Sequence, residues 1–366
     1  MRSWWALTIL NAYVKYRIQG DFLNPDPALA IDIFNPTYGI DPAFFTNALA
    51  TTVLPGENFS VFKDEFYGVY FQDHITLWDK LHIIGGGRYD WAEVGRGNSG
   101  SFDEADANLP AATRDDEEFS PRVGVLYQAW PWLGVYGSWS QSFSANNGVS
   151  ATGETLEPQT GEQWETGLKT ELFNKALSAT LAFYHLTKEN ILTADLSTPD
   201  PNDNAPIGES RSQGIELDVL GAITDELSVI GSYAYTDAEI TKDNFGLEGN
   251  RVANVPFHSG SAFLTYEFKE FDALRGLSLG FGVFAVGDRE GDDDNTFLLP
   301  GYARLDAFAA YRRQVGPTRV TAQLNIRNIT DKEYFESTDP FSNLNPRLGI
   351  FPGAPLTAIG TLRVEF

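Results

Sequence analysis

The feature that most constrains this chain is a run of β-type segments whose connections alternate between long and short. About 14 segments place apolar and polar residues in alternation, the two-residue period of strands that have one apolar face. We expect strands at 5–20, 61–76, 79–92, 119–129, 132–144, 162–173, 176–190, 210–222, 226–240, 256–268, 276–288, 301–312, 318–330 and 356–366. No run reaches 18 apolar residues, which excludes a helical membrane span.

The connections after odd-numbered segments are long, and those after even-numbered segments are short. The long ones are 21–60, 93–118, 145–161, 191–209, 241–255, 289–300 and 331–355, whereas Pro131 and Asn174-Lys175 mark typical short turns. This layout places all long loops at one end of an up-and-down antiparallel sheet. Outer-membrane barrels combine short periplasmic turns with longer extracellular loops. The sequence therefore predicts an all-β fold, a single outer-membrane antiparallel β-barrel domain with about 14 strands.

Side chains along the segments agree with a sheet between lipid and water. In one segment Ile215 and Leu217 share a face, while Glu216 and Asp218 share the opposite face, which must look into water. Aromatic residues cluster at both strand ends, as expected for girdles at the two lipid–water interfaces. We expect one girdle at Trp78, Trp130 and Trp132 beside short turns, and another at Tyr89, Trp91, Tyr233 and Tyr235 near long loops.

Composition and motifs argue against several other functions. The chain has 50 acidic and 26 basic residues, and its formal charge of −24 disfavours nucleic-acid binding. It has no cysteine, and its four histidines are scattered, so no metal site is predicted. The G-x-G-x-x-G match at Gly95–Gly100 precedes an acidic segment without helical period, so we interpret it as a loop. Asp292–Asp294 is interpreted as a solvated loop, and no catalytic constellation is present.

Nine segments, taken in order, resemble a known family. They read IDIFNPTYG (31–39), GVYFQD (68–73), GGRYDW (86–91), FSPRVG (119–124), LEPQTGEQWETGLK (156–169), RSQGIELD (211–218), NVPFH (254–258), LPGYARLD (299–306) and NIRNITDKEY (325–334). Together with the terminal Phe366, they are similar to the TonB-dependent siderophore receptors, near those for ferrichrome and other hydroxamates. The segment Gly353–Leu356 departs from the family's usual G-x-P-R because Leu replaces the Arg.

The resemblance implies a 22-stranded barrel with a filled lumen, of which residues 1–366 match the C-terminal barrel portion. We expect the plug domain and the TonB box to be absent. The implied function is outer-membrane, TonB-dependent uptake of ferric siderophores, not catalysis, and this portion alone is not expected to transport. Expected partners are the ferric siderophore, outer-membrane lipid and lipopolysaccharide, and the insertion machinery that reads Phe366. The TonB–ExbB–ExbD complex would act only if a plug with a TonB box is supplied.

The resemblance also suggests how the ligand is held. The siderophore fills the coordination sphere of iron, so no protein cofactor or metal ligand is expected, and aromatic side chains should pack against the chelate. The candidate substrate-binding residues are Tyr38, Phe44, Phe45, Tyr70, Phe297 and Phe341. The charges expected in the lumen are Arg122, Glu165, Lys169, Glu216, Asp218, Arg304, Asp306 and Arg327.

Two alternatives remain open from the sequence. The chain is either a complete 14-stranded passive channel or, in another class, a soluble β-rich binding module. The first alternative requires residues 5–20 to pair with residues 356–366 and close the cylinder.

Overall fold

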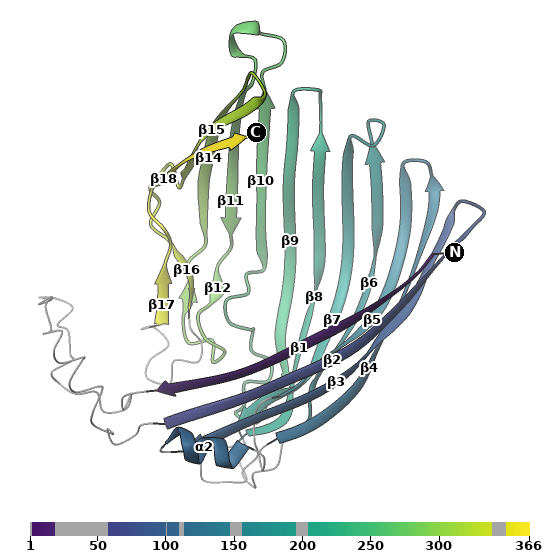
Figure 1. Ribbon diagram of the computed structural model, residues 1–366, viewed down its shortest axis with the longest axis vertical. Helices are drawn as coiled ribbons and strands as arrows, with labels where there is room; N and C mark the ends of the chain where they lie inside the picture. The colour runs from purple at the N-terminus through teal and green to yellow at the C-terminus, as the bar shows by residue number, and fades with distance from the viewer. Residues whose placement is uncertain are drawn as a thin grey trace, which may run out of the picture.

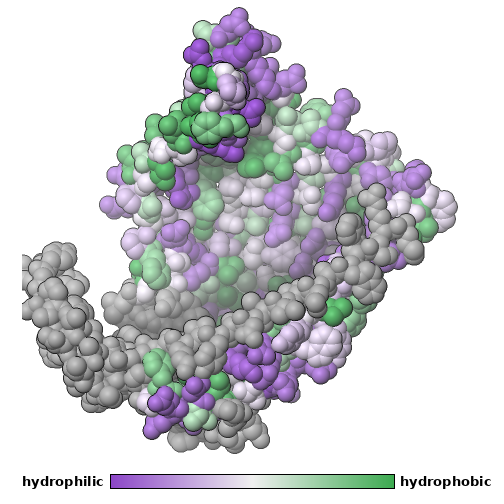
Figure 2. All heavy atoms as spheres, in the orientation of Figure 1, coloured by the Kyte–Doolittle hydropathy of each residue, from purple (hydrophilic) through white to green (hydrophobic). Residues whose placement is uncertain are grey.

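Fourteen strands form one antiparallel sheet in which every strand pairs with its neighbour in the chain, apart from two small hairpins that lie outside it (Figure 1). The computed structural model describes residues 2–18, 58–99, 101–109, 113–146, 156–194, 204–338 and 349–366. The sheet is strongly curved, with β1 crossing in front of the other strands (Figure 1). Figure 2 shows that the molecule is hollow on the concave side of this sheet.

The strands of the sheet are β1 (Arg2–Ile18), β2 (Asn58–Leu77), β3 (Leu81–Ser99), β4 (Thr113–Trp130), β5 (Leu133–Ser144), β6 (Gln159–Leu172), β7 (Leu177–Ala194), β8 (Asn204–Ala222), β9 (Leu227–Lys242), β10 (His258–Glu267), β11 (Leu277–Val286), β14 (Tyr302–Val315), β15 (Thr318–Arg327) and β18 (Thr357–Glu365). The short hairpins are β12 (Arg289–Glu290) with β13 (Leu298–Leu299) and β16 (Phe335–Thr338) with β17 (Ile350–Pro352). In the described residues the helical elements are α2 (Phe102–Asn108) and the 3₁₀ turn η3 (Asp272–Leu274).

The number of strands and the placement of their connections confirm the sequence prediction. Several strands are longer than expected, most of them toward the long connections: β3 continues to Ser99, and β4 begins at Thr113. The two-residue period that predicts a strand arises from apolar residues on one face. This period ends where the strand extends beyond the apolar band of the sheet, so the pattern does not predict the last residues of the strand. Backbone pairing continues beyond this point, as in the register from Tyr89↔Phe119 to Gly95↔Thr113.

The convex face carries exposed apolar residues at every second position. On β2 these are Tyr67, Val69 and Phe71, and on β4 they include Val125 and Tyr127. Exposure of so many large apolar side chains in regular rows is unusual for a face in contact with water. It matches the outward apolar band of a membrane barrel.

Aromatic residues mark both edges of this apolar band. At the short-turn edge, Trp78, Trp130 and Trp132 are exposed, and the rings of Trp130 and Trp132 stack with centroids 6.0 Å apart. At the other edge, the centroids of Tyr89 and Trp91 lie 4.7 Å apart. Tyr233 and Tyr235 both contact the His258 ring there. Trp139 and Trp164, which the sequence analysis did not assign to a girdle, form a further pair at 6.0 Å on this edge.

The expectations of no helix in the acidic segment 102–118 and of a loop at Gly95–Gly100 were wrong. Residues up to Ser99 belong to β3, and α2 follows, with the Ser101 side chain accepting a hydrogen bond from the Glu104 amide at 3.3 Å. A Cβ at Gly97 would lie 1.9 Å from the Ala105 carbonyl oxygen, so glycine permits the helix to pack on the sheet. Seven residues make fewer than two turns of helix, too few to display a helical period.

The closed 14-stranded channel is not what the structure shows. In the described residues β1 pairs only with β2, and β18 pairs only with β15, so both are edges of an open sheet. In the same part of the chain, no helix has the length and apolar character needed to span a membrane.

Candidate functional site

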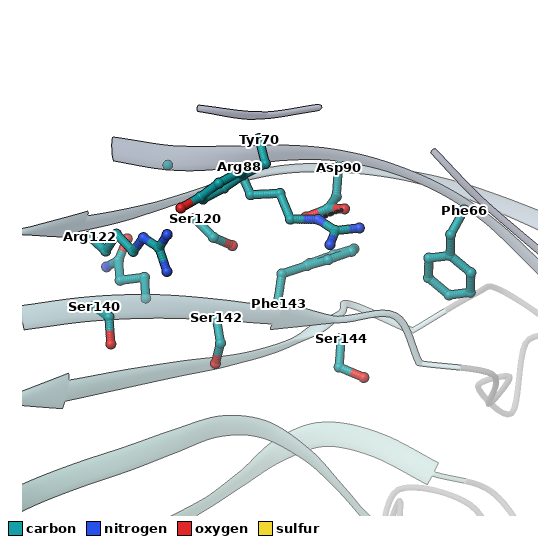
Figure 3. Close-up of a pocket in the computed structure, with 12 residues that line it drawn as sticks. Phe66, Tyr70, Arg88, Asp90, Ser120, Arg122, Ser140, Ser142, Phe143 and Ser144 are labelled. Atoms are coloured by element: carbon teal, nitrogen blue, oxygen red, sulfur yellow. Dashed lines mark hydrogen bonds and ion pairs between the residues drawn. The ribbon is translucent and has the colours of Figure 1, made fainter. Parts of the chain in front are cut away.

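A cavity of about 590 Å³ lies against the strands β2–β5 on the concave side of the sheet. Its lining residues are Phe66, Tyr70, Gly87, Arg88, Asp90, Ser120, Arg122, Ser140, Gln141, Ser142, Phe143 and Ser144. In Figure 3, Phe143 points toward Arg88, whereas Ser142 and Ser144 point to the other side of β5. The cavity thus combines two guanidinium groups, a phenol and two phenyl rings.

One polar group in the cavity is built around Tyr70. The Tyr70 hydroxyl donates to the Gln72 side-chain oxygen at 2.7 Å, and Arg122 donates to the same oxygen at 2.5 Å. The Arg122 guanidinium lies 4.6 Å from the Tyr70 ring centroid, a cation–π arrangement. Gln72 pairs with Gly86, and Gly86 pairs with Arg122, so the two side chains meet across a position without a side chain. This arrangement fixes the aromatic face of Tyr70.

A second polar group is the ion pair between Arg88 and Asp90 on β3. The Arg88 Nε donates to Asp90 Oδ1 at 2.6 Å, and 11% of the Asp90 side chain is exposed against 39% for Arg88. Gly68 faces this pair, since a Cβ there would lie 2.5 Å from Arg88 Nη2. With Arg122, the cavity lining has two positive groups and one negative group, although the chain carries a charge of −24. An anionic or hydroxyl-rich ligand with flat faces suits this local charge.

The structure describes only two of the six predicted binding residues. Tyr70 lines the cavity, as expected for a residue on the water-facing side of β2. Phe297 lies between β12 and β13, where a Cβ at Gly291 would come within 2.2 Å of its ring, and it does not line this cavity. Tyr38, Phe44, Phe45 and Phe341 lie outside the described residues.

The cavity also contains residues that the sequence analysis did not select. Arg88 and Asp90 alternate with the girdle residues Tyr89 and Trp91, and this alternation alone places them on the concave face. Phe143 shares a strand face with Trp139 and Gln141, so the alternation places it on the outward face. Its place in the cavity is therefore visible only in the structure.

Several predicted lumen charges take part in polar contacts on this face. Glu165 accepts hydrogen bonds from the Tyr136 hydroxyl at 2.6 Å and from Gln163 at 3.0 Å. Lys169 Nζ lies 4.8 Å from the Tyr136 ring centroid. Arg304 and Asp306 form two parallel hydrogen bonds, each 3.0 Å long. Glu216, Asp218 and Arg327 are exposed.

Of the acidic run Asp292–Asp294, only Asp294 is exposed as expected of a solvated loop, whereas Asp292 and Asp293 are held in the structure. Asp292 is 2% exposed, and its carboxylate accepts the Thr296 amide at 2.7 Å. Asp293 Oδ1 accepts the Ala253 amide at 2.8 Å, which joins the β13 side of the molecule to the connection after β9. These carboxylates are therefore structural. Within the described ranges, no three His or carboxylate side chains are placed to hold a metal ion.

Comparisons with known proteins place this geometry in context. The family model described as TonB dependent receptor-like, beta-barrel matches residues 4–329. A metal-pseudopaline receptor of Pseudomonas aeruginosa is 37% identical over 300 residues, which cover 81% of this chain and 40% of that protein. A ferrichrome outer membrane transporter/phage receptor of Escherichia coli is 36% identical over 310 residues, 83% of this chain and 38% of its own length.

A similar architecture occurs among solved structures. The ferric preacinetobactin receptor of Acinetobacter baumannii superposes with a TM-score of 0.72 at 24% identity, covering 98% of this chain and 51% of that one. The present chain spans about two fifths of the length of the curated relatives named above.

Proposed function

Because the chain belongs to the TonB-dependent receptor-like β-barrel family, we propose that it forms barrel wall in a receptor for ferric siderophore uptake. Members of this family are outer-membrane receptors and transporters rather than enzymes, and the apolar convex face of this sheet lies in that membrane. We infer no catalytic role for the chain. The names of the relatives support the ligand class, since they bind ferrichrome, ferrioxamine B or a metal–pseudopaline complex.

The observation that carries the proposal is the cavity on the concave, water-facing side of β2–β5. A ferric siderophore is a large polar chelate whose own donor atoms surround the iron. Tyr70, Phe66 and Phe143 offer flat faces for such a chelate, while Arg88 and Arg122 offer charged hydrogen-bond donors. Binding would therefore need no protein ligand to iron.

The proposed partners follow from the same role. The lipid and lipopolysaccharide of the outer membrane would contact the two aromatic girdles, and the insertion machinery would read the strand β18 with Phe366. The TonB complex with ExbB and ExbD would supply energy through a plug segment that carries a TonB box.

A binding measurement tests the proposal. The chain is refolded in detergent micelles and titrated with ferric siderophores from a panel of hydroxamate, catecholate and carboxylate chelates. Binding of a ferric siderophore should quench the tryptophan fluorescence of the chain. Replacing Tyr70→Ala together with Arg122→Gln should weaken binding about tenfold or more, which corresponds to about 1.4 kcal/mol.

The matched control is Tyr127→Ala, an equal truncation on the convex face of β4, where 49% of the side chain is exposed. This variant should bind like the unmodified chain. Equal losses in the double variant and in the control would contradict the site, and binding to none of the chelates by folded protein would contradict the function.

A further inference from the structure

Two of the four histidines, which are scattered along the sequence, are neighbours on the concave face. Thr76 of β2 pairs directly with His82 of β3, and His74 precedes Thr76 by two residues, so the three side chains share one face of the hairpin. Tyr70, which lines the cavity of about 590 Å³, belongs to the same face by the same alternation. The two histidines therefore lie on the water-facing side of the sheet.

The two imidazole rings lie at a separation at which they can share one metal ion. Their centroids are 5.6 Å apart, and the ring planes are inclined by 34°. A transition metal bound at about 2.0 Å from an imidazole nitrogen lies about 3.2 Å from the centroid of that ring. Two rings on one metal then have centroids about 5.2 Å apart at a tetrahedral angle and about 6.4 Å apart when the rings are opposite. The observed separation falls between these two values.

A hydrogen bond orients one of the two rings. The Thr76 hydroxyl lies 3.2 Å from Nδ1 of His82, which leaves Nε2 of His82 as the nitrogen for a metal ion. Histidines that bind metals commonly have the second ring nitrogen bonded in this way, because the bond fixes the orientation and the tautomer of the ring. Both histidines are half-buried, so each ring is restrained and still accessible to solvent.

The pair of His74 and His82 is separate from the cavity proposed for the chelate. Neither residue lines that cavity. His74 lies four residues beyond Tyr70 along β2, which is about 13 Å toward the short turn at Trp78. A ligand of the pair is therefore held by other side chains than a ligand of the cavity.

We propose that His74 and His82 bind one divalent transition-metal ion of the class of Zn²⁺, through one imidazole nitrogen each. Imidazole suits zinc, copper and nickel, whereas Mg²⁺ and Ca²⁺ prefer oxygen ligands. Within the described residues no third His or carboxylate joins the pair, so water fills the remaining coordination positions. The bound ion links β2 to β3 beside their turn.

Calorimetric titration with ZnCl₂ tests the site in the untagged chain, refolded in detergent micelles. An excess of Mg²⁺ is present, since the chain carries a charge of −24 and its carboxylates attract divalent cations. The unmodified chain should bind Zn²⁺ saturably, and the double variant His74→Ala, His82→Ala should bind it about tenfold or more weakly. The control double variant His185→Ala, His258→Ala loses as many imidazoles, whose rings have other partners, and should bind like the unmodified chain.

Chemical modification locates the ion in the unmodified chain and does not depend on the folding of any variant. Diethyl pyrocarbonate acylates free imidazole nitrogens, and mass spectrometry of peptides reports the modified fraction at each histidine. Saturating Zn²⁺ should slow the modification of His74 and His82 several-fold and leave that of His185 and His258 unchanged.

Two outcomes would overturn the proposal. Equal Zn²⁺ affinity of the two double variants would place the ion elsewhere. Equal modification rates of His74 and His82 with and without Zn²⁺ would show that these rings do not bind it. Neither outcome bears on the chelate site, because that site consists of other residues and is tested with a different ligand.

Discussion

Single glycines decide which side chains can meet on the concave face. Gly86 lies between Gln72 and Arg122 in the register, and a Cβ there would lie 2.3 Å from the Phe71 carbonyl oxygen. Gly68 has a similar role, because a Cβ there would lie 2.5 Å from Arg88 Nη2 and 2.6 Å from Asp90 Oδ1. Contacts this short are not tolerated, so the ion pair exists because residue 68 has no side chain.

The substitution Gly68→Ala should therefore displace the Arg88–Asp90 pair and weaken ferric chelate binding several-fold. Its cost to stability should be moderate, about 1 kcal/mol, since long side chains can move aside. Gly85→Ala is the matched control, because a Cβ at Gly85 meets nothing within 4 Å. Fluorescence titration and urea unfolding measure the two effects, and an unchanged affinity of Gly68→Ala would show that the pair does not contribute to binding.

At the scale of elements, the strands β8 and β9 form a hairpin that extends beyond the outer girdle. Tyr235 marks the girdle on β9, and the strand continues to Lys242. At the open end of the hairpin, opposite its turn, Glu209 accepts hydrogen bonds from Lys242 and from Thr241, the latter at 2.8 Å. The bond from Lys242 is the main cause that lowers the pKa of Glu209 below its usual value of 4.5.

The pH dependence of this hairpin end follows from the direction of that shift. A lowered folded-state pKa stabilises the folded hairpin above the ordinary pKa of Glu, and the contribution is lost as pH falls through the lowered value. Hydrogen-exchange protection of the amides near Glu209 should therefore differ between the unmodified chain and Glu209→Gln at pH 7, by a few-fold for such an exposed pair. The difference should shrink in acid, and a difference that is constant with pH would contradict the ion pair.

The elements also show how far the sequence analysis could reach. Local periodicity predicts the number of strands, the end of the sheet that carries the long loops, and the girdles at Trp78, Trp130 and Tyr89. It does so because a membrane imposes the same alternation on each strand separately. The helix α2 was not predicted because seven residues are too few to display a helical period. Of the cavity, the sequence predicted only Tyr70 and the lumen charge Arg122. Phe143 enters the cavity only where β4 and β5 separate, a relation between strands that no single segment encodes.

At the scale of the whole molecule, the open sheet determines what residues 1–366 can do by themselves. Both edge strands, β1 and β18, lack a partner on one side in the described chain, so the hollow is not enclosed by this wall. A lumen that is open to lipid would place Glu216, Asp218 and Lys169 against hydrocarbon, where unpaired charges are costly. Gated uptake needs a closed wall around the chelate. In the proposed role, the chelate is enclosed only if further wall joins the edges β1 and β18.

Residues 1–366 expressed alone should accordingly give no siderophore-dependent growth to an iron-starved strain that lacks its own receptors. The same strain expressing a full-length relative, the ferrichrome transporter, and supplied with ferrichrome is the positive control. Heat-modifiable migration of the expressed chain on gels verifies that it is folded in the outer membrane. Growth above the empty-vector level with any siderophore of the panel would mean that the wall closes in the membrane, by β1 pairing with β18 or by assembly of several chains.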